Sequence, residues 1–262
     1  KAIRRQRQMC IRDRLSMGSL ISTSSCAPSG DSRDKRGKVS DDDQFLFIGD
    51  DIAIAQTEYG KVQGYLLNHV YTFLGVPYGA DTSGKNRFMP PQKPEPWTDV
   101  RPAVFYGNTA PQRMENRWPN NYGTFADHWN YWDVSEDCLY LNVWTPGIAD
   151  GKKRPVLVWL HGGGFTNGSG IEQDGYHGEN ISREGDIVFC SINHRLGPIG
   201  FSDLSGVGGE AYKDSGNVGM LDIIAALRWV HDNIANFGGD PGNVTVMGPV
   251  SYTHLTLPTN SL

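Results

Sequence analysis

Short apolar runs that alternate with one long amphipathic segment constrain the fold of this chain more than any other feature. Between the apolar runs at residues 187–192 and 244–247, residues 217–236 carry apolar side chains at helical spacing. Asn217 is a candidate N-cap for this helix, and Gly238-Gly239 would end it. Strands joined by a helix of this length predict a right-handed crossover and a parallel sheet, so the fold class is α/β. Four runs rich in β-branched residues are typical of strands buried on both faces: residues 139–144, 156–160, 187–192 and 244–247.

The sequence before these four runs predicts that the fold begins with antiparallel strands. We expect structure from about Phe45, where residues 53–55 and 61–67 flank Tyr59-Gly60 as a hairpin. The apolar run at residues 71–76 follows as a further strand.

The two ends of the chain differ in composition from the middle. Residues 1–40 carry ten Lys or Arg against three Asp or Glu, although the whole chain has a net charge of -5, and they contain no Phe, Tyr or Trp. Such a segment cannot bury enough surface to order itself. We therefore predict a disordered or non-native leader over residues 1–44, a single domain over residues 45–248, and a non-native or unstructured tail over residues 249–262.

Composition also excludes several function classes. The basic end lacks the aromatic side chains on which bases stack, so nucleic acid is not an expected partner. No run of 18 or more apolar residues occurs, so no membrane span is expected, and the four cysteines lack the spacing of a zinc site. Residues 15–26 match the stub of an export signal, which would make the protein periplasmic, secreted or lipid-anchored, but they match a polar linker as well.

A glycine-rich segment directly after the run 156–160 is the candidate site. His161-Gly162-Gly163-Gly164-Phe165 lies at the carboxyl end of a central strand, where open α/β sheets place their sites. Three consecutive glycines let the backbone aim N–H groups at one point, as acyl transfer requires for the oxygen that becomes negative. The alternatives are a plain turn and a phosphate-binding loop, but neither G-x-G-x-x-G nor a Walker-type lysine follows.

The motifs around this loop resemble those of the type-B carboxylesterase and cholinesterase family. The run Glu136-Asp137-Cys138-Leu139-Tyr140-Leu141-Asn142-Val143-Trp144-Thr145-Pro146 is similar to a long and specific signature of that family. The resemblance covers roughly residues 54–248. It continues in Arg87-Phe88 with Pro90-Pro91 and Trp97, Asn193-His194-Arg195-Leu196-Gly197, Gly216-Asn217-Val218-Gly219, and Phe237-Gly238-Gly239-Asp240-Pro241 with Val244-Thr245.

The resemblance implies a fold and a chemistry. The fold would be the N-terminal half of an α/β-hydrolase, with antiparallel opening strands followed by a mostly parallel sheet with crossover helices. The parent enzyme would hydrolyse a small-molecule carboxylic ester through a Ser, an acid and a His in that chain order, without a cofactor or a metal. Gly163 and Gly164 match two oxyanion donors, and Trp129 and Phe165 would line the substrate pocket. For Trp129, a loop that packs its own aromatic side chains is the alternative.

Two ion pairs also follow from the resemblance as structural features. Arg87 would pair with Glu136, and Arg195 with Asp222, both substantially buried beneath the site loops. The alternative is that each residue is a solvated surface charge of little energetic consequence.

The sequence departs from the family pattern where the nucleophile belongs. Gly-x-Ser-x-Gly would need Ser at position 250 and Gly at 252, but the chain has Val250 and Tyr252, and Ser251 is one residue late. Both residues 250–260 and residues 5–14 resemble translated sequencing-adapter DNA. We therefore expect an inactive esterase fragment without nucleophile, acid or histidine. The alternative is a catalytically silent cholinesterase-like binding or adhesion module.

A second departure concerns the aromatic loop before the signature. The family closes this loop with a disulfide to the cysteine that matches Cys138, but the expected partner position holds Ala110. We therefore expect packing alone to hold the loop. Acyl specificity and oligomeric state stay open.

Overall fold

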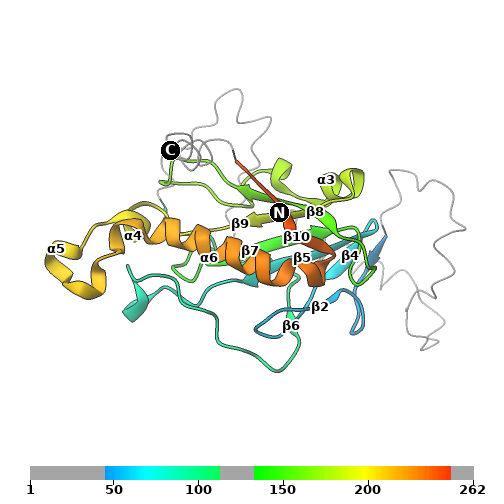
Figure 1. Ribbon diagram of the computed structural model, residues 1–262, viewed down its shortest axis with the longest axis horizontal. Helices are drawn as coiled ribbons and strands as arrows, with labels where there is room; N and C mark the ends of the chain where they lie inside the picture. The colour runs from blue at the N-terminus through cyan, green and yellow to red at the C-terminus, as the bar shows by residue number, and fades with distance from the viewer. Residues whose placement is uncertain (1–44, 113–132, 249–262) are drawn as a thin grey trace, which may run out of the picture. The chain divides into compact units, whose positions relative to one another are not determined.

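The computed structural model describes residues 45–112 and 133–248, which contain a seven-stranded sheet of order β1-β4-β5-β7-β9-β8-β10 (Figure 1). A three-stranded sheet of order β2-β3-β6 lies in the same part of the chain. The strands are β1 (Leu46–Phe47), β2 (Ile54–Gln56), β3 (Lys61–Gln63), β4 (Tyr65–Leu67), β5 (Val70–Pro77), β6 (Arg101–Pro102), β7 (Tyr140–Thr145), β8 (Arg154–Leu160), β9 (Val188–Ile192) and β10 (Gly239–Met247).

The large sheet has a parallel part and an antiparallel part. β8 runs parallel to both β9 and β10, so the crossover predicted from the last two apolar runs is confirmed. β7, in contrast, is antiparallel to both of its neighbours, β5 and β9, although most of its residues are buried. An apolar run therefore reports burial on both faces of a sheet and not strand direction.

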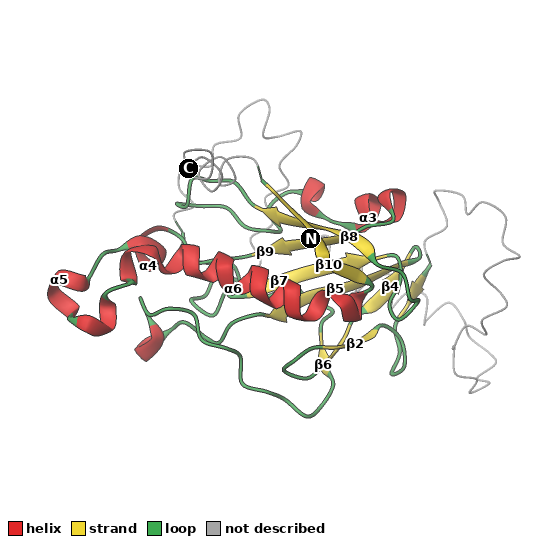
Figure 2. Ribbon diagram, in the orientation of Figure 1, coloured by secondary structure: helices red, strands yellow, loops and turns green. Residues whose placement is uncertain are grey.

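Helices cover both faces of the large sheet (Figure 2). The amphipathic segment forms α6 (Val218–Asn233), which begins after Asn217, although that side chain makes no capping hydrogen bond. Gly238 stops the helical chain in the left-handed conformation, at φ 79°. The other helices are α3 (Glu179–Gly185), α4 (Gly197–Phe201), α5 (Ser205–Gly208) and the 3-10 turns η1 (Gly84–Asn86), η2 (Asp174–Tyr176), η3 (Glu210–Tyr212), η4 (Ser215–Asn217) and η5 (Ile234–Phe237).

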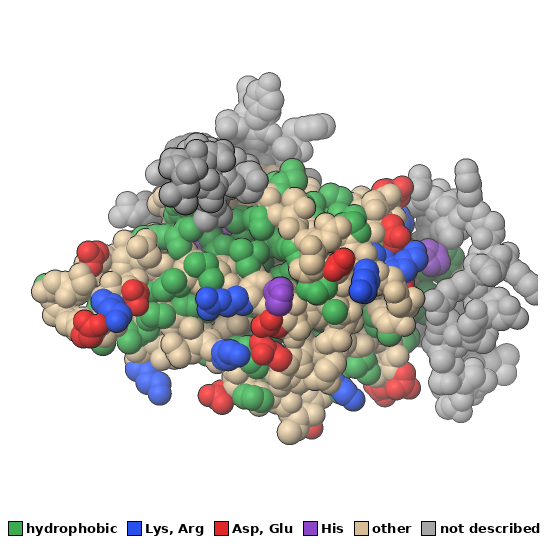
Figure 3. Space-filling model, in the orientation of Figure 1, with side chains coloured by type: hydrophobic (Ala, Val, Ile, Leu, Met, Phe, Trp, Pro, Cys, Tyr) green, Lys and Arg blue, Asp and Glu red, His purple; other side chains and the backbone are tan. Residues whose placement is uncertain are grey.

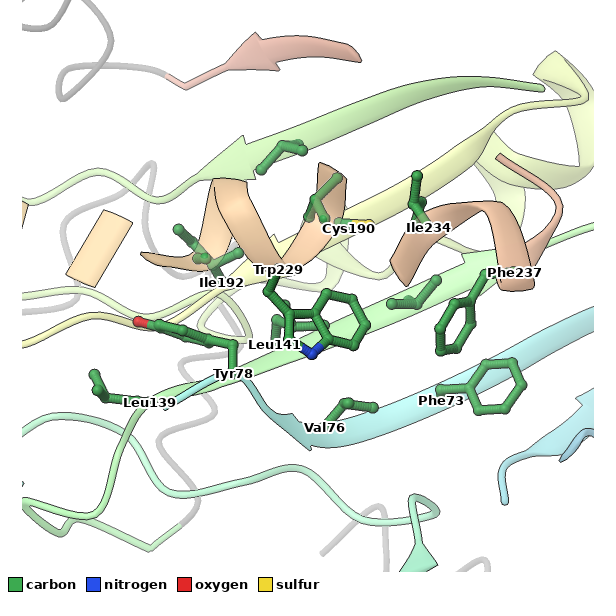
Figure 4. Packing of buried hydrophobic residues seen from close by; sticks show 14 of the residues in the cluster. Phe73, Val76, Tyr78, Leu139, Leu141, Cys190, Ile192, Trp229, Ile234 and Phe237 are labelled. Carbon is green, nitrogen blue, oxygen red and sulfur yellow. The ribbon is translucent and has the colours of Figure 1, made fainter. Parts of the chain in front are cut away.

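Aromatic side chains join α6 and η5 to the sheet (Figure 4). The Phe237 ring lies edge-on to Phe73 of β5 at a centroid distance of 4.9 Å and 5.7 Å from Trp229 of α6. On the opposite face, Trp144 and Phe189 pack together, and Ser182 of α3 donates a hydrogen bond to the Trp144 carbonyl. The two apolar faces of β7 thus bury against different helices, which explains its continuous apolar sequence.

The opening strands differ in one respect from the sequence prediction. β2 and β3 form the expected hairpin, but residues 61–67 are not one strand, because the chain breaks at Gly64 and continues as β4 in the large sheet. A Cβ atom at Gly64 would overlap the carbonyl oxygen of Thr72, so only glycine permits this close approach. β4 then turns into β5 through Asn68 and His69, both at positive φ, as in a tight two-residue hairpin.

Several predictions fall outside the described residues. They are the leader at residues 1–44, the tail at residues 249–262, and Trp129. In the part that is described, no helix has the length and apolar character that a bilayer crossing requires.

Candidate functional site

The carboxyl ends of β8 and β10 lie next to each other and define the candidate site. Met247 of β10 pairs with Trp159 of β8, so Gly248 follows beside the start of the glycine loop. A Cβ atom at Gly248 would overlap the carbonyl oxygen of Leu160. Gly248 therefore lies against the last residue of β8, directly before the glycine loop, at the edge of a parallel sheet where sites are expected.

The glycine loop folds into a compact turn. Gly163 and Gly164 have φ of 108° and 61°, a region that side chains rarely adopt. The Gly163 carbonyl accepts hydrogen bonds from the amides of Thr166 and Asn167 at 3.1 and 3.3 Å, and a Cβ atom at Gly163 would overlap the Asn167 carbonyl oxygen. Glycine at position 163 is thus required both by the backbone angle and by the close approach.

The amides of Gly163 and Gly164 are candidate hydrogen-bond donors for a ligand. Gly163 and Gly164 are both exposed, and within residues 45–112 and 133–248 no acceptor is paired with either amide. Two neighbouring N–H groups without internal acceptors can bind a negatively charged oxygen. The amide that follows the family's nucleophile, the usual third donor, falls outside the described residues.

Two stacked imidazoles lie beneath the loop. The rings of His161 and His194 are 4.8 Å apart and nearly parallel, and Nδ1 of each donates to a backbone carbonyl, that of Gly162 at 2.8 Å and that of Arg195 at 2.9 Å. Burial lowers the pKa of His194. Among the described residues, its Nε2 has no hydrogen-bond partner. Burial thus favours the neutral form of His194, and the stacked pair packs against the glycine loop.

Phe165 ends the loop in a strained conformation. Its φ is 62°, which is unusual for a residue with a side chain, and the Gly197 amide holds its carbonyl at 2.7 Å. The half-buried ring packs against Phe201 at 5.2 Å and His194 at 6.3 Å. An aromatic surface thus borders the two exposed amides.

The ion pair of Arg195 and Asp222 lies in the interior. The guanidinium Nη2 and Nε donate to the two carboxylate oxygens at 2.6 and 2.8 Å, and the side chains are 1% and 0% exposed. Nη1 donates to the carbonyl of Met89 at 2.8 Å. This pair ties the strand-to-helix turn after β9 to α6 and to the chain near residue 89.

The pair of Arg87 and Glu136 is present, but its predicted burial is wrong. The atoms Nη2 and Oε1 are 2.7 Å apart, and Nε also donates to the carboxylate, yet the Arg87 side chain is 47% exposed. Arg87 directly follows η1, a turn without buried residues, so its guanidinium contacts Glu136 at the surface and not in the interior. Hydrogen bonding to Glu136 raises the pKa of Arg87.

The ends of the aromatic loop are joined by backbone hydrogen bonds. Cys138 is buried and forms no disulfide with the other cysteine that the structure describes, Cys190, in keeping with the missing partner at position 110. The Thr109 amide, however, donates to the Asp133 carbonyl, and the Thr109 carbonyl accepts from Ser135, at 2.9 and 3.0 Å. The expectation that packing alone holds this loop is therefore wrong, because a short β-bridge closes it.

Two side-chain amides for which the sequence analysis predicted no site role contact the far end of the glycine loop. Gln112 binds the backbone of Gly168, and Asn193 accepts a hydrogen bond from the amide of Gly170. Neither residue belongs to a pattern that indicates this role, because the contacts join segments distant in sequence.

The mixed sheet with helices on both faces and a glycine loop after a parallel strand that is paired on both sides defines an α/β-hydrolase. The fold resembles an esterase from Clostridium hathewayi that can hydrolyze aliphatic aromatic polyesters, with a TM-score of 0.72 and 42% identity over 79% of this chain and 39% of the other. It also resembles the Geobacillus stearothermophilus carboxylesterase EST55, with a TM-score of 0.65 and 43% identity over 75% of this chain and 37% of the other.

The model of the carboxylesterase family matches residues 51–251, and the chain belongs to this family. The para-nitrobenzyl esterase of Bacillus subtilis is 43% identical over 74% of this chain, and the acetylcholinesterase of Electrophorus electricus is 40% identical over 78%. The chain spans 37% and 33% of the length of these two relatives.

Proposed function

We propose that this chain supplies the oxyanion half of a serine carboxylic-ester hydrolase site, with the Gly163 and Gly164 amides as donors. The observation that carries the proposal is that both glycines are exposed and that neither amide has an acceptor within the described residues, beside the end of β10. Membership of the carboxylesterase family supports the reaction class.

In the proposed reaction, a serine oxygen attacks the ester carbonyl and its proton passes to a histidine. The carbonyl oxygen becomes negative and receives the hydrogen bonds of the two glycine amides, each of which lowers the barrier by about 3 to 4 kcal/mol in comparable sites. Collapse of the intermediate expels the alcohol, which takes the proton from histidine. Water then releases the acid from the acyl-enzyme by the same steps.

The substrate would be an uncharged or weakly polar small-molecule carboxylic ester. The aromatic border formed by Phe165 and Phe201 supports an apolar group next to the reacting carbonyl. The names of two relatives also support a small-molecule substrate: one is a para-nitrobenzyl esterase, and another is a phenmedipham hydrolase from Pseudarthrobacter oxydans.

We further propose that these 262 residues by themselves hydrolyse no ester. Positions 250 and 252 hold Val and Tyr, where the pattern of the nucleophile turn needs Ser and Gly. Loss of triad members leaves about 10³ to 10⁴-fold acceleration over water in serine hydrolases, from the remaining donors and from binding. An oxyanion site without its third donor would leave an even smaller rate acceleration.

The test is turnover of p-nitrophenyl acetate by the purified chain and by its Val250→Ser variant. We expect both rates to equal that of an unrelated protein, because Val250→Ser restores a hydroxyl but no base and no acid. A rate above that background, abolished by Ser251→Ala or His254→Ala, would contradict the proposed inactivity and would require a triad within this chain.

A catalytically silent binding or adhesion module is the second candidate, favoured by Val250 and Tyr252 at the two positions that the nucleophile turn needs. Reading the parent gene from an independent DNA preparation separates the two. Gly-x-Ser-x-Gly after Met247 supports the enzyme, whereas an open reading frame that continues through Pro249-Val250 supports the binding module.

A further inference from the structure

The backbone behind the glycine loop obtains its hydrogen bonds from two side-chain amides. Residues 168–170 belong to no helix or strand, so their polar groups need other partners. The Oε1 atom of Gln112 accepts from the Gly168 amide at 2.7 Å, and its Nε2 donates to the Gly168 carbonyl at 2.9 Å. Gln112 thus binds both polar groups of one residue, as a neighbouring strand would.

Asn193 forms a second anchor two residues further on. Its Oδ1 accepts from the Gly170 amide at 2.8 Å, and its Nδ2 donates to the carbonyl of Asn108 at 3.1 Å. Asn193 is only 4% exposed, and its own backbone amide donates to the Tyr140 carbonyl. Both anchors therefore join residues 168–170 to residues 108–112, and Asn193 also connects them to Tyr140 at the start of β7.

Gly168 in turn packs directly against the first residues of the glycine loop. Its φ is 110°, and a Cβ atom there would overlap the Gly162 carbonyl oxygen and Nδ1 of His161. The backbone of Gly168 thus lies directly against the residues that precede Gly163. A shift of Gly168 must move Gly162 or the His161 ring, since closely packed atoms leave no room for independent adjustment.

We propose that Gln112 is a positioning residue for the oxyanion amides, acting through Gly168 and assisted by Asn193. The inference rests on the proposed function of Gly163 and Gly164. The role requires an amide, with one donor and one acceptor side by side. A glutamate of the same size would turn its second carboxylate oxygen toward the carbonyls of Gly168 and Ala110, both of which accept from Gln112 Nε2 at 2.9 and 3.1 Å.

The test uses amide hydrogen exchange and the backbone ¹H–¹⁵N resonances of the full chain, so it does not depend on ester turnover. We expect Gln112→Met and Gln112→Glu each to speed exchange at Gly168 by about tenfold, as loss of one to two hydrogen bonds implies. Both should also shift the resonances of Gly163 and Gly164. Gln92→Met is the matched control, since the exposed Gln92 side chain donates only to the nearby Pro90 carbonyl and should move neither readout.

Gln112→Asn provides a milder variant should the others fail to fold. It keeps the amide but is one methylene shorter, so it cannot reach both groups of Gly168, and the same shifts are expected at reduced size. Unchanged Gly163 and Gly164 resonances in any folded Gln112 variant would overturn the proposal, even with faster exchange at Gly168. Failure of the esterase proposal would leave these spectroscopic results intact, and the reverse also holds.

Discussion

At the scale of single residues, the two ion pairs differ in burial and should differ in their contribution to stability. Arg195 and Asp222 are almost completely buried and make three mutual hydrogen bonds, one of them from the Arg195 backbone amide. The Arg87 pair lies at the surface, where solvent weakens the attraction between charges. Geometry alone, which is close to ideal in both pairs, does not separate them.

Arg195→Met should lower the free energy of unfolding by about 3 to 5 kcal/mol, because it leaves the Asp222 carboxylate buried without its partner. Arg87→Met should have a much smaller effect. Urea unfolding of both variants beside the parent chain measures the difference. Equal midpoints for the two variants would mean that the Arg195 pair is not the buried anchor described above.

His194 should make stability depend on pH. Burial lowers its folded-state pKa, so between that value and the unfolded value of about 6.5 the unfolded chain binds the additional proton. The contribution of neutral His194 to stability is therefore lost as pH falls below about 6.5. The charge of nearby Asp222 raises the pKa of His194, but burial is the larger effect.

His194→Phe keeps a flat ring on His161 but cannot titrate. We expect its unfolding free energy to fall less steeply than that of the parent between about pH 6.5 and 5. Part of the slope should remain, since burial also lowers the pKa of His177. The exposed His231 gives the control His231→Gln, and slopes that coincide for parent and His194→Phe would refute the prediction.

At the scale of elements, β10 is the open edge of the parallel part of the sheet. It pairs only with β8 among the described strands, and Met247 near its end is 49% exposed. Figure 3 shows apolar side chains gathered above α6. Ile224, within α6, is 43% exposed. An unpaired strand with apolar neighbours is a site of edge-to-edge association.

Met247→Lys should therefore reduce self-association of the chain, because a charge at a strand edge opposes pairing with a second strand. Sedimentation velocity over a range of protein concentrations measures the effect. Val207→Lys is the control, since Val207 is 87% exposed on α5 and away from any strand edge. If both lysine variants reduce association equally, general charge and not the β10 edge is responsible.

At the scale of the whole molecule, the described core and the two ends of the sequence follow different compositional rules. Residues 1–40 contain no aromatic side chain, and residues 250–262 fit no predicted element. We expect amides in both segments to exchange without protection, whereas those of β8, paired on both sides, exchange slowly. Hydrogen exchange with mass spectrometry measures this, and protection of either segment to the level of β8 would contradict the prediction.

The sequence by itself determined the α/β class, the crossover through α6, and the glycine loop after β8. These features depend on local patterns, namely apolar periodicity, glycine content and motif order. The family also followed from motifs, above all from the run that begins at Glu136 and continues through β7.

Only the tertiary structure decided which neighbours these residues meet. It set the antiparallel direction of β7, the break at Gly64, the exposure of Arg87, and the contacts of Gln112 with Gly168. None of these has a local signal, because each depends on groups brought together from distant parts of the chain. A buried strand has the same apolar pattern in either direction, and an arginine has the same sequence neighbours whether its carboxylate lies in the core or at the surface.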